Sequence, residues 1–162
     1  MIVVGGDNLI DLIESARSDG VVSFTGARGG SGYNTARAVA RQQQVVGFIT
    51  PIAMDNLGHF LADKLLADGV ELLSPRSEKP SSLAVVTLID GQPSYQFYRD
   101  DTAERQVDLT FLQNKFPAKG RAFHLTSLRS STVLMQMPGL ISLLTNIVWA
   151  LLQLWIRMCV LC

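Results

Sequence analysis

The first 128 residues contain no cysteine, and both cysteines of the 162-residue chain, Cys159 and Cys162, stand near its C-terminal end. This absence argues against a disulfide framework or a cysteine-based metal site in residues 1–128, and it fits the reducing cytoplasm, where we expect the protein to work. The N-terminus also lacks the basic residues that open an export signal, and Asp7 and Asp11 fall where such a signal would be uncharged.

The chain has no excess of charge of either sign, because 14 basic and 14 acidic side chains balance. That balance argues against a broad basic surface, so we expect no nucleic-acid partner. Acidic residues are absent after Asp108, however, and Arg157 is the one charged residue between positions 130 and 162. So sharp a break predicts two parts of different character, residues 1–128 and a hydrophobic tail at 129–162.

Short apolar runs separated by glycines predict an α/β domain with a parallel sheet and flanking helices. The expected strands are 2–4, 21–25 and 45–49. Helical spacing of apolar residues predicts one helix at 31–43, and a second that Asp55 caps and Gly69 ends. The second helix is expected to bury an apolar stripe made of Leu57, Phe60, Leu61, Leu65 and Leu66.

After the second expected helix, the alternation of strands and helices gives way to consecutive β-rich runs. Residues 83–89 and 94–98 are β-rich runs on either side of Asp90-Gly91, a pair typical of a hairpin turn. We interpret this hairpin as a small antiparallel lid outside the parallel sheet. A short helix is expected at 109–115, and residues 122–125 are expected to return to the parallel sheet.

The sequence Arg-Gly-Gly-Ser-Gly-Tyr-Asn at 28–34 stands at the start of the first expected helix. Glycines let a backbone approach a ligand closely, and a helix N-terminus presents unpaired N–H groups. The stretch is neither a Walker A loop nor a dinucleotide fingerprint, because it lacks Gly-Lys-Ser/Thr and the third spaced glycine. Taken alone it fits a ligand-binding loop and an ordinary turn equally well.

Read onward, this stretch resembles the N-terminal signature of the PfkB (ribokinase-like) carbohydrate kinases. The positions that match in order and spacing are Gly29, Gly30, Asn34, Ala36, Gly47, Asp55, Gly58, Gly69 and Val70. The likeness continues to Phe97-Tyr98-Arg99 and covers residues 1 to about 128. It implies a ribokinase-like (Rossmann-like) fold and transfer of the γ-phosphate of ATP to a sugar hydroxyl, with a fructokinase-like substrate favoured by the 97–99 region.

The resemblance also implies a site for a small-molecule sugar. Asp11 matches an acidic residue that hydrogen-bonds substrate hydroxyls, and Gly29, Gly30 and Asn34 match the loop and amide that contact the sugar. Arg99 matches a basic lid residue that reaches the substrate. Many members of the family pair through their lids, so a homodimer through the lid is also expected.

The residues themselves leave other interpretations open. Without the motif, Asp11 fits a solvated acid equally well, and Arg99 fits a weak surface ion pair with Asp100 or Asp101. We expect no metal site, because His59 and His124 have no cysteine or carboxylate at ligand spacing and are interpreted as structural.

The residues that the family uses for catalysis are not found in this sequence. The resemblance places ATP, Mg²⁺ and the catalytic aspartate on a Gly-Ala-Gly-Asp stretch in the C-terminal half; Gly5-Gly6-Asp7 is similar but follows the first strand. Because phosphoryl transfer depends on positioning and charge stabilisation, we expect a truncated chain with no turnover of its own. An inactive sugar-binding fragment or pseudogene product is the alternative to an active kinase.

The hydrophobic tail at 129–162 has two interpretations. If the codons that could encode residues 133–138 are read one base earlier, the genetic code permits Asp-Ala-Asp-Ala-Trp. The same shift across 155–160 permits Asp-Pro-Asn-Val-Arg, which resembles what the family carries next. A single-base deletion near Leu128 would therefore explain an out-of-frame tail. The rival is a membrane-tethered binding module, because 139–156 is uncharged and about long enough to span a bilayer; we consider a membrane partner the weaker hypothesis.

Overall fold

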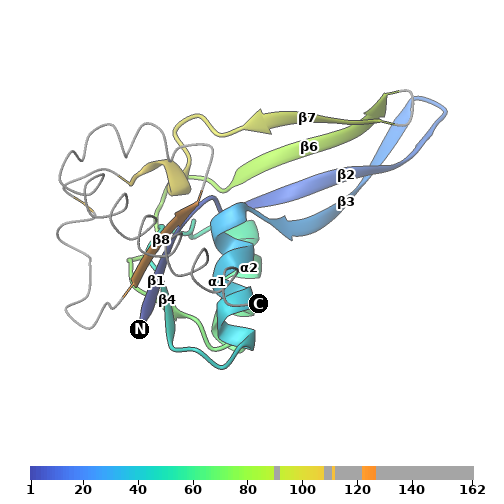
Figure 1. Cartoon of the computed structure of the whole chain (residues 1–162). Coiled ribbons are helices and arrows are strands. Elements are labelled where there is room, and N and C mark those ends of the chain that lie inside the picture. Colours follow the sequence, from blue (N-terminus) through green and yellow to red (C-terminus); the bar gives the residue numbers. More distant parts are fainter. Residues whose placement is uncertain (90–91, 108–110, 112–121, 127–162) are drawn as a thin grey trace, which may run out of the picture. The chain divides into compact units, whose positions relative to one another are not determined.

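The computed structural model of the chain describes residues 1–89, 92–107, 111 and 122–126, which all belong to the unit Met1–Leu128 (Figure 1). Apart from Phe111, the helix expected at 109–115 lies outside the described residues, as do the Asp90-Gly91 turn and the tail at 129–162. The division of the chain at residue 128 therefore stays a prediction.

A parallel sheet in the order β5-β4-β1-β8 forms the base of the fold. Its strands are β1 (Ile2–Gly6), β4 (Val46–Phe48), β5 (Glu71–Leu72) and β8 (Ala122–Thr126). Consecutive apolar residues such as Val3 and Val4 are both buried, as is usual for a parallel strand that is covered on both faces. The expected strands at 2–4, 45–49 and 122–125 are confirmed. The two-residue β5 was not expected, because so short a strand leaves no hydrophobic period.

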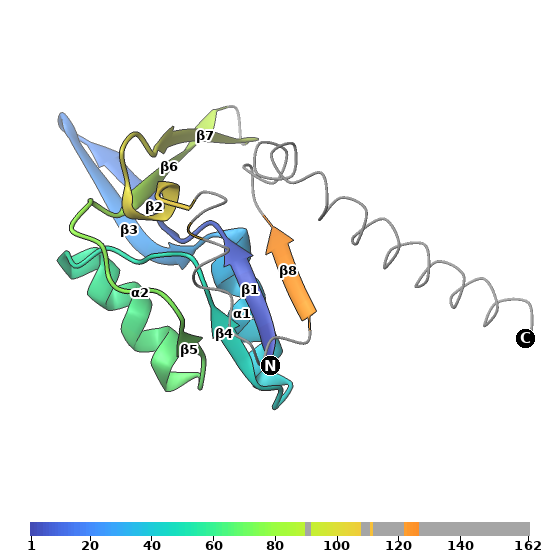
Figure 2. The same ribbon diagram turned by 90° about the vertical axis from the view of Figure 1, so that its left-hand side faces the viewer.

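Two helices accompany this sheet, α1 (Ser31–Arg41) and α2 (Asn56–Ala67), and Figure 2 shows α1 running along the sheet. The expected cap of α2 is confirmed, since the Asp55 carboxylate accepts a hydrogen bond from the Gly58 N–H at 2.7 Å. Just beyond the last turn, Gly69 adopts a φ of +84°.

The apolar stripe expected on α2 is only partly right. Leu61 and Leu65 are fully buried, but Leu57, Phe60 and Leu66 are exposed. Small residues take part of the inward face: Gly58 and Ala62 are buried, and a Cβ at Gly58 would lie 2.0 Å from the carbonyl oxygen of Ala53. The helix therefore approaches its neighbours through backbone at a position where hydrophobicity alone predicts a larger side chain.

A second sheet, in the order β3-β2-β6-β7, forms the lid (Figure 1). Its strands are β2 (Leu9–Ser18), β3 (Val21–Gly29), β6 (Ser82–Ile89) and β7 (Gln92–Tyr98). The expected hairpin of β6 and β7 is confirmed, and Tyr95 opposes Val86 in it.

The β2–β3 hairpin, in contrast, was missed. A strand was expected only at 21–25, and the predicted order of strand, loop and helix is wrong because this whole hairpin stands between β1 and α1. From Ser15 onward β2 is exposed, so its sequence lacks the alternation of a half-buried strand.

The lid and the parallel sheet share one hydrophobic core. Ile10 of β2 is buried with Val4, Phe48 and Leu61, and Leu12 and Leu83 of the lid pack against the same cluster. After β7 the chain turns through a short 3-10 helix, η1 (Ala103–Arg105), whose Ala103 and Glu104 are buried. The lid is thus joined to the base of the fold at the ends of its strands nearest β1.

Candidate functional site

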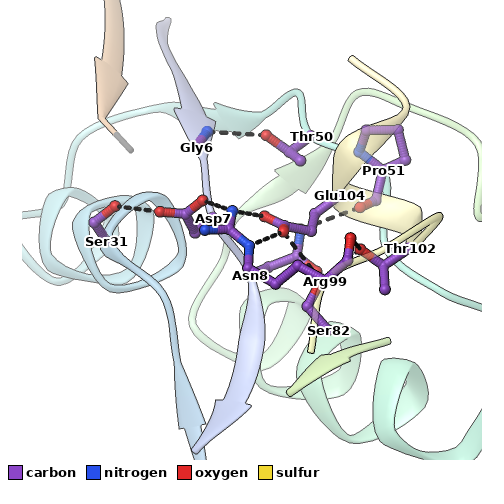
Figure 3. Close-up of polar contacts among 10 residues, drawn as sticks. All are labelled: Gly6, Asp7, Asn8, Ser31, Thr50, Pro51, Ser82, Arg99, Thr102 and Glu104. Carbon is purple, nitrogen blue, oxygen red and sulfur yellow. Dashed lines mark hydrogen bonds and ion pairs between the residues drawn. The ribbon is translucent and has the colours of Figure 1, made fainter. Parts of the chain in front are cut away.

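The four strands of the lid meet the rest of the fold at one set of polar contacts (Figure 3). Asp7 and Asn8 connect β1 to β2, Gly30 connects β3 to α1, Ser82 begins β6, and Arg99 directly follows β7. Figure 3 shows the side chains of Asp7, Ser82 and Arg99 directed toward one another together with Glu104 of η1. This convergence defines the candidate site.

Arg99 lies at the middle of these contacts, and its side chain is only 9% exposed. Its Nε donates to Glu104 Oε1 at 2.7 Å and its Nη2 to Glu104 Oε2 at 3.0 Å, while Nη2 also donates to Asp7 Oδ1. Burial opposes the charged guanidinium, but the hydrogen bonds and charges of Glu104 and Asp7 outweigh it and raise the pKa of Arg99.

The alternative of a surface ion pair between Arg99 and Asp100 or Asp101 is wrong. Both aspartates are exposed, and Asp101 pairs with Lys79 at 2.5 Å instead. Arg99 turns inward because two buried carboxylates compensate the cost of removing its charge from water. Its partners are Glu104, five residues later, and Asp7, 92 residues earlier, and not the two residues that follow it directly.

Glu104 is held by two hydroxyl groups as well as by Arg99. Ser82 Oγ lies 3.0 Å from Glu104 Oε1 and 2.7 Å from Thr102 Oγ1, and Thr102 Oγ1 donates to the carbonyl oxygen of Arg99 at 3.0 Å. Burial raises the pKa of Glu104, and the guanidinium of Arg99 opposes that rise. Among the described residues, every buried polar side-chain atom has a hydrogen-bond partner.

Asp7 extends these contacts to the glycine loop. Its Oδ2 accepts a hydrogen bond from Ser31 Oγ at 3.3 Å, and its carbonyl oxygen accepts one from the Tyr33 N–H at 3.0 Å. Gly30 has a φ of +105°, and a Cβ there would lie 2.3 Å from the Asp7 carbonyl oxygen. Only glycine fits between Asp7 and the start of α1 in this conformation.

Asp11 and Gly29 are in direct contact. Asp11 stands in β2, paired with Ala27 of β3 and Ala84 of β6, and a Cβ on Gly29 would lie 2.1 Å from Asp11 Oδ2. Partial burial raises the pKa of the Asp11 carboxyl. The carboxylate is half-buried against the backbone of the glycine loop, in an arrangement that can accept hydrogen bonds from ligand hydroxyls.

The structure thus places the five predicted site residues in two connected groups. Asp11 touches Gly29, and the Asn34 N–H donates to the carbonyl oxygen of Gly30 at 2.9 Å, with Asn34 itself exposed on the first turn of α1. Arg99 reaches the same loop indirectly, through Asp7.

Sequence reasoning missed the roles of Asp7, Asn8, Ser31 and Glu104. Asn8 Nδ2 donates to the carbonyl oxygen of Pro51 at 3.1 Å, and Gly6 N–H donates to Thr50 Oγ1 at 2.9 Å, so the end of β1 is tied to the chain that follows β4. Polar residues directly after a buried strand were a usable clue for Asp7 and Asn8. Glu104 stands five residues after Arg99, and nothing in that spacing marks the two as buried partners.

The part of the chain that the structure describes forms neither a metal-binding cluster nor a membrane-spanning helix. No group of three or more histidine, cysteine, aspartate or glutamate side chains is arranged to hold a metal ion there. No helix in that part is long and apolar enough to cross a membrane. The anchor hypothesis for 139–156 lies outside the described residues and stays untested.

Comparison with known proteins gives one family. The profile described as pfkB family carbohydrate kinase matches residues 1–144. A fructokinase of Rhizobium leguminosarum bv. trifolii is 36% identical over 111 residues, and fructokinase-2 of Solanum lycopersicum is 30% identical over 134 residues. A crystal structure of a fructokinase from Xylella fastidiosa with bound ATP superposes with a TM-score of 0.67 at 30% identity, covering 76% of this chain.

The chain spans only part of each of these relatives. It covers 33% of the Rhizobium protein, 41% of the tomato protein and 38% of the Xylella chain. The chain therefore corresponds to one portion of these longer relatives, and the ribokinase-like likeness applies to that portion.

Proposed function

The chain belongs to the pfkB family of carbohydrate kinases, and from this membership we propose that residues 1–128 form the sugar-binding part of an ATP-dependent, fructokinase-like kinase. The named relatives are fructokinases, and the family transfers phosphate to sugars. Fructose is the first candidate substrate because the relatives named above are fructokinases. The activity of the whole kinase is part of the proposal, since the chain covers about two fifths or less of those relatives.

One observation carries this proposal: the Asp11 carboxylate rests on the backbone of Gly29 at the junction of lid and loop. A carboxylate held in this way accepts hydrogen bonds from neighbouring hydroxyls in a fixed direction, which suits a polyol. We assign Gly29, Gly30 and Asn34 to the same ligand. For Arg99 we propose that Nη1 reaches the sugar, because the carboxylates of Glu104 and Asp7 engage Nε and Nη2.

ATP is proposed as the phosphate donor because a related fructokinase has been crystallised with it. Among the described residues, no three or more acidic, histidine or cysteine side chains are grouped so as to hold a metal ion. We therefore derive no phosphoryl-transfer step from this chain, and assign ATP, Mg²⁺ and the catalytic base to the portion of the kinase that the chain does not span.

The second candidate function is sugar binding without turnover. It is favoured by the short span of the chain relative to its relatives, and it is what we expect of the 162-residue protein on its own. The hypotheses that 129–162 is out of frame or a membrane anchor remain part of this proposal. The family match extends to residue 144, so the boundary at Leu128 needs its own test.

A homodimer through the lid and a cytoplasmic location complete the proposal. Val21, Leu88 and Tyr95 of the lid strands are each more than half exposed, which favours contact with a second lid. Sedimentation of the full chain tests the dimer: a Leu88→Lys variant is expected to shift it toward the monomer, whereas a monomeric wild-type chain would contradict this part.

The proposed function is tested by titrating the full chain with D-fructose, D-glucose and D-ribose, and by an ATP-dependent phosphorylation assay with the same sugars. Saturable binding of one sugar without turnover supports the sugar-binding part. Turnover at ordinary kinase rates would contradict the expectation that the chain alone is inactive. Absence of binding to any sugar by the folded protein would contradict the proposed function itself.

A further inference from the structure

We propose that Asp7, Arg99 and Glu104 form an anchor node that holds the Gly29–Gly30 loop and the lid in the geometry that binds the sugar. In this role the three residues are positioning residues, with Asp7 acting on the loop and Glu104 acting through Arg99. The inference deepens the proposed function and rests on it for the identity of the ligand. Its mechanical part, control of the loop by a remote glutamate, does not depend on the ligand.

The first argument is the position of the anchor node in the fold. Asp7 precedes β2, Gly30 follows β3, Ser82 begins β6 and Arg99 follows β7, so all four lid strands reach the rest of the fold at this point. Each of these chain segments contacts a member of the node, through Ser82 Oγ on Glu104 and through Gly30 against the Asp7 carbonyl. A change at the node is therefore transmitted to every strand of the lid.

The second argument is the chemistry of the contacts. The side chains of Asp7, Arg99 and Glu104 are 7%, 9% and 2% exposed. Arg99 holds Glu104 with two parallel hydrogen bonds and Asp7 with a third, and the planar guanidinium fixes the directions of all three. Apolar side chains would pack at this position without fixing the angle between the chain segments. The directed hydrogen bonds of Arg99 instead favour one relative placement of β7, η1 and the end of β1.

The third argument is the path from the node to the sugar loop. The two carboxylate oxygens of Asp7 have different partners: Oδ1 accepts from Arg99, and Oδ2 accepts from Ser31 Oγ at 3.3 Å. The carbonyl oxygen of Asp7 also accepts the Tyr33 N–H at 3.0 Å. A change on the lid side of Asp7 weakens the hold on its carboxylate, and with it the contact between that carboxylate and Ser31 on the first turn of α1.

The experiment compares three variants of the full chain. Glu104→Gln keeps the shape of the side chain but removes the charge that holds Arg99. Ser31→Ala removes only the hydroxyl that joins Asp7 to α1, and it keeps the proposal testable if the first variant does not fold. Glu14→Gln is the matched control, because it breaks a Glu–Arg pair of similar length, Glu14 to Arg17 at 2.9 Å, whose arginine is 65% exposed on β2.

Amide hydrogen exchange, measured residue by residue by NMR, reports on the loop without any ligand. We expect Glu104→Gln and Ser31→Ala to speed exchange of the Tyr33 and Asn34 amides about tenfold over Glu14→Gln. The Val70 amide, which follows α2 and donates to the Leu65 carbonyl, should be unchanged. We also expect the affinity for D-fructose to fall about tenfold in both. Faster exchange at Val70 and Tyr33 alike, or no change at either, would overturn the inference, because the node would then be merely structural.

The two proposals fail in different ways. If the wild-type chain binds no sugar but the exchange of Tyr33 and Asn34 responds as stated, the proposed function is wrong and the positioning of the loop by the node stands. If the wild-type chain binds fructose and Glu104→Gln changes neither its affinity nor the exchange of those amides, the node is wrong and the proposed function stands.

Discussion

Asp7 and Arg99 stand 92 positions apart in the chain and form an ion pair in which both side chains are less than one-tenth exposed. Glu104 completes the charge arrangement from the other side of the guanidinium. A buried arginine between two carboxylates has no water to replace a lost partner, so each member depends on the other two. The junction of lid and base is therefore sensitive to a change of charge.

Replacement of Arg99 by methionine tests that sensitivity. Arg99→Met removes the guanidinium with which both buried carboxylates form ion pairs, and we expect the free energy of unfolding to fall by about 3–5 kcal/mol. Urea denaturation of the full chain measures it. Lys79→Met is the control, because it breaks the Lys79–Asp101 pair, whose side chains are 42% and 76% exposed, and should cost at most about 1 kcal/mol. Equal losses in the two variants would contradict the account of Arg99.

Gly30 and Gly20 provide a matched pair for the glycine loop. Both have a positive φ, +105° and +76°, but a Cβ at Gly20 meets nothing within 4 Å, whereas one at Gly30 meets the Asp7 carbonyl. We expect Gly20→Ala to cost about 1–2 kcal/mol from backbone strain alone. Gly30→Ala adds a clash with backbone and should cost roughly 1–3 kcal/mol more, besides weakening sugar binding. Thermal unfolding with and without fructose measures the loss of stability and the loss of sugar binding. Equal losses of stability in Gly20→Ala and Gly30→Ala would show that the loop is not packed against Asp7.

The sequence predicted those elements whose physical cause is local. Asp55 caps α2 because a carboxylate three residues before Gly58 can reach its N–H, and such spacing is visible in sequence. The Gly29–Gly30 pair and Asp11 were found through the family resemblance, and the structure brings Gly29 and Asp11 into contact. Contacts within a few residues of one another, or in a long family motif, were accessible without coordinates.

What could not be predicted depends on contacts that are distant in sequence. The contact of Arg99 with Asp7 forms only when the end of β7 returns to the end of β1, and the contact with Glu104 forms only because the chain turns through η1, so sequence suggested the exposed neighbours Asp100 and Asp101 instead. The strand β2 was missed because its outer half is exposed on both faces. The inward face of α2 was misjudged because Gly58 and Ala62, rather than Leu57 and Phe60, meet the core.

Asp68 governs part of the acid stability. It lies beside Lys64 at 2.5 Å and Arg37 at 2.7 Å, and these two cations lower its pKa from 3.8 to about 2. A carboxyl whose pKa is lower in the folded state stabilises the fold above the unfolded pKa, and this contribution is lost as pH falls from about 4 to about 2. Asp68→Asn should lower stability at pH 7 and flatten the decline between pH 4 and 2.

The pH dependence of urea denaturation checks the role of Asp68. Asp63→Asn, an exposed change on the same helix, serves as the control and should keep the wild-type slope between pH 4 and 2. An unchanged slope in Asp68→Asn would show that the three-residue cluster does not link α1 to α2 in solution.

The origin of the tail is tested on the gene. If 129–162 is out of frame, the nucleotide sequence near the codon for Leu128 has lost one base, and the shifted frame encodes kinase-like sequence after it. In the shifted frame, the codons of 133–138 and 155–160 should then encode Asp-Ala-Asp-Ala-Trp and Asp-Pro-Asn-Val-Arg. An intact frame through the Leu128 codon, with no kinase-like coding sequence beside it, would contradict the frameshift hypothesis.

The central claim is that Asp11 and the glycine loop bind a sugar, and calorimetric titration of the full chain with D-fructose tests it most directly when wild type and Asp11→Asn are compared. We predict saturable binding by the wild type and a loss of at least about tenfold in affinity for Asp11→Asn, because hydrogen bonds to a charged acceptor disappear. The variant should be no less stable, since burial raises the pKa of Asp11 and disfavours its charge. Equal affinity in the two proteins, or no sugar bound by the folded wild type, would contradict the account.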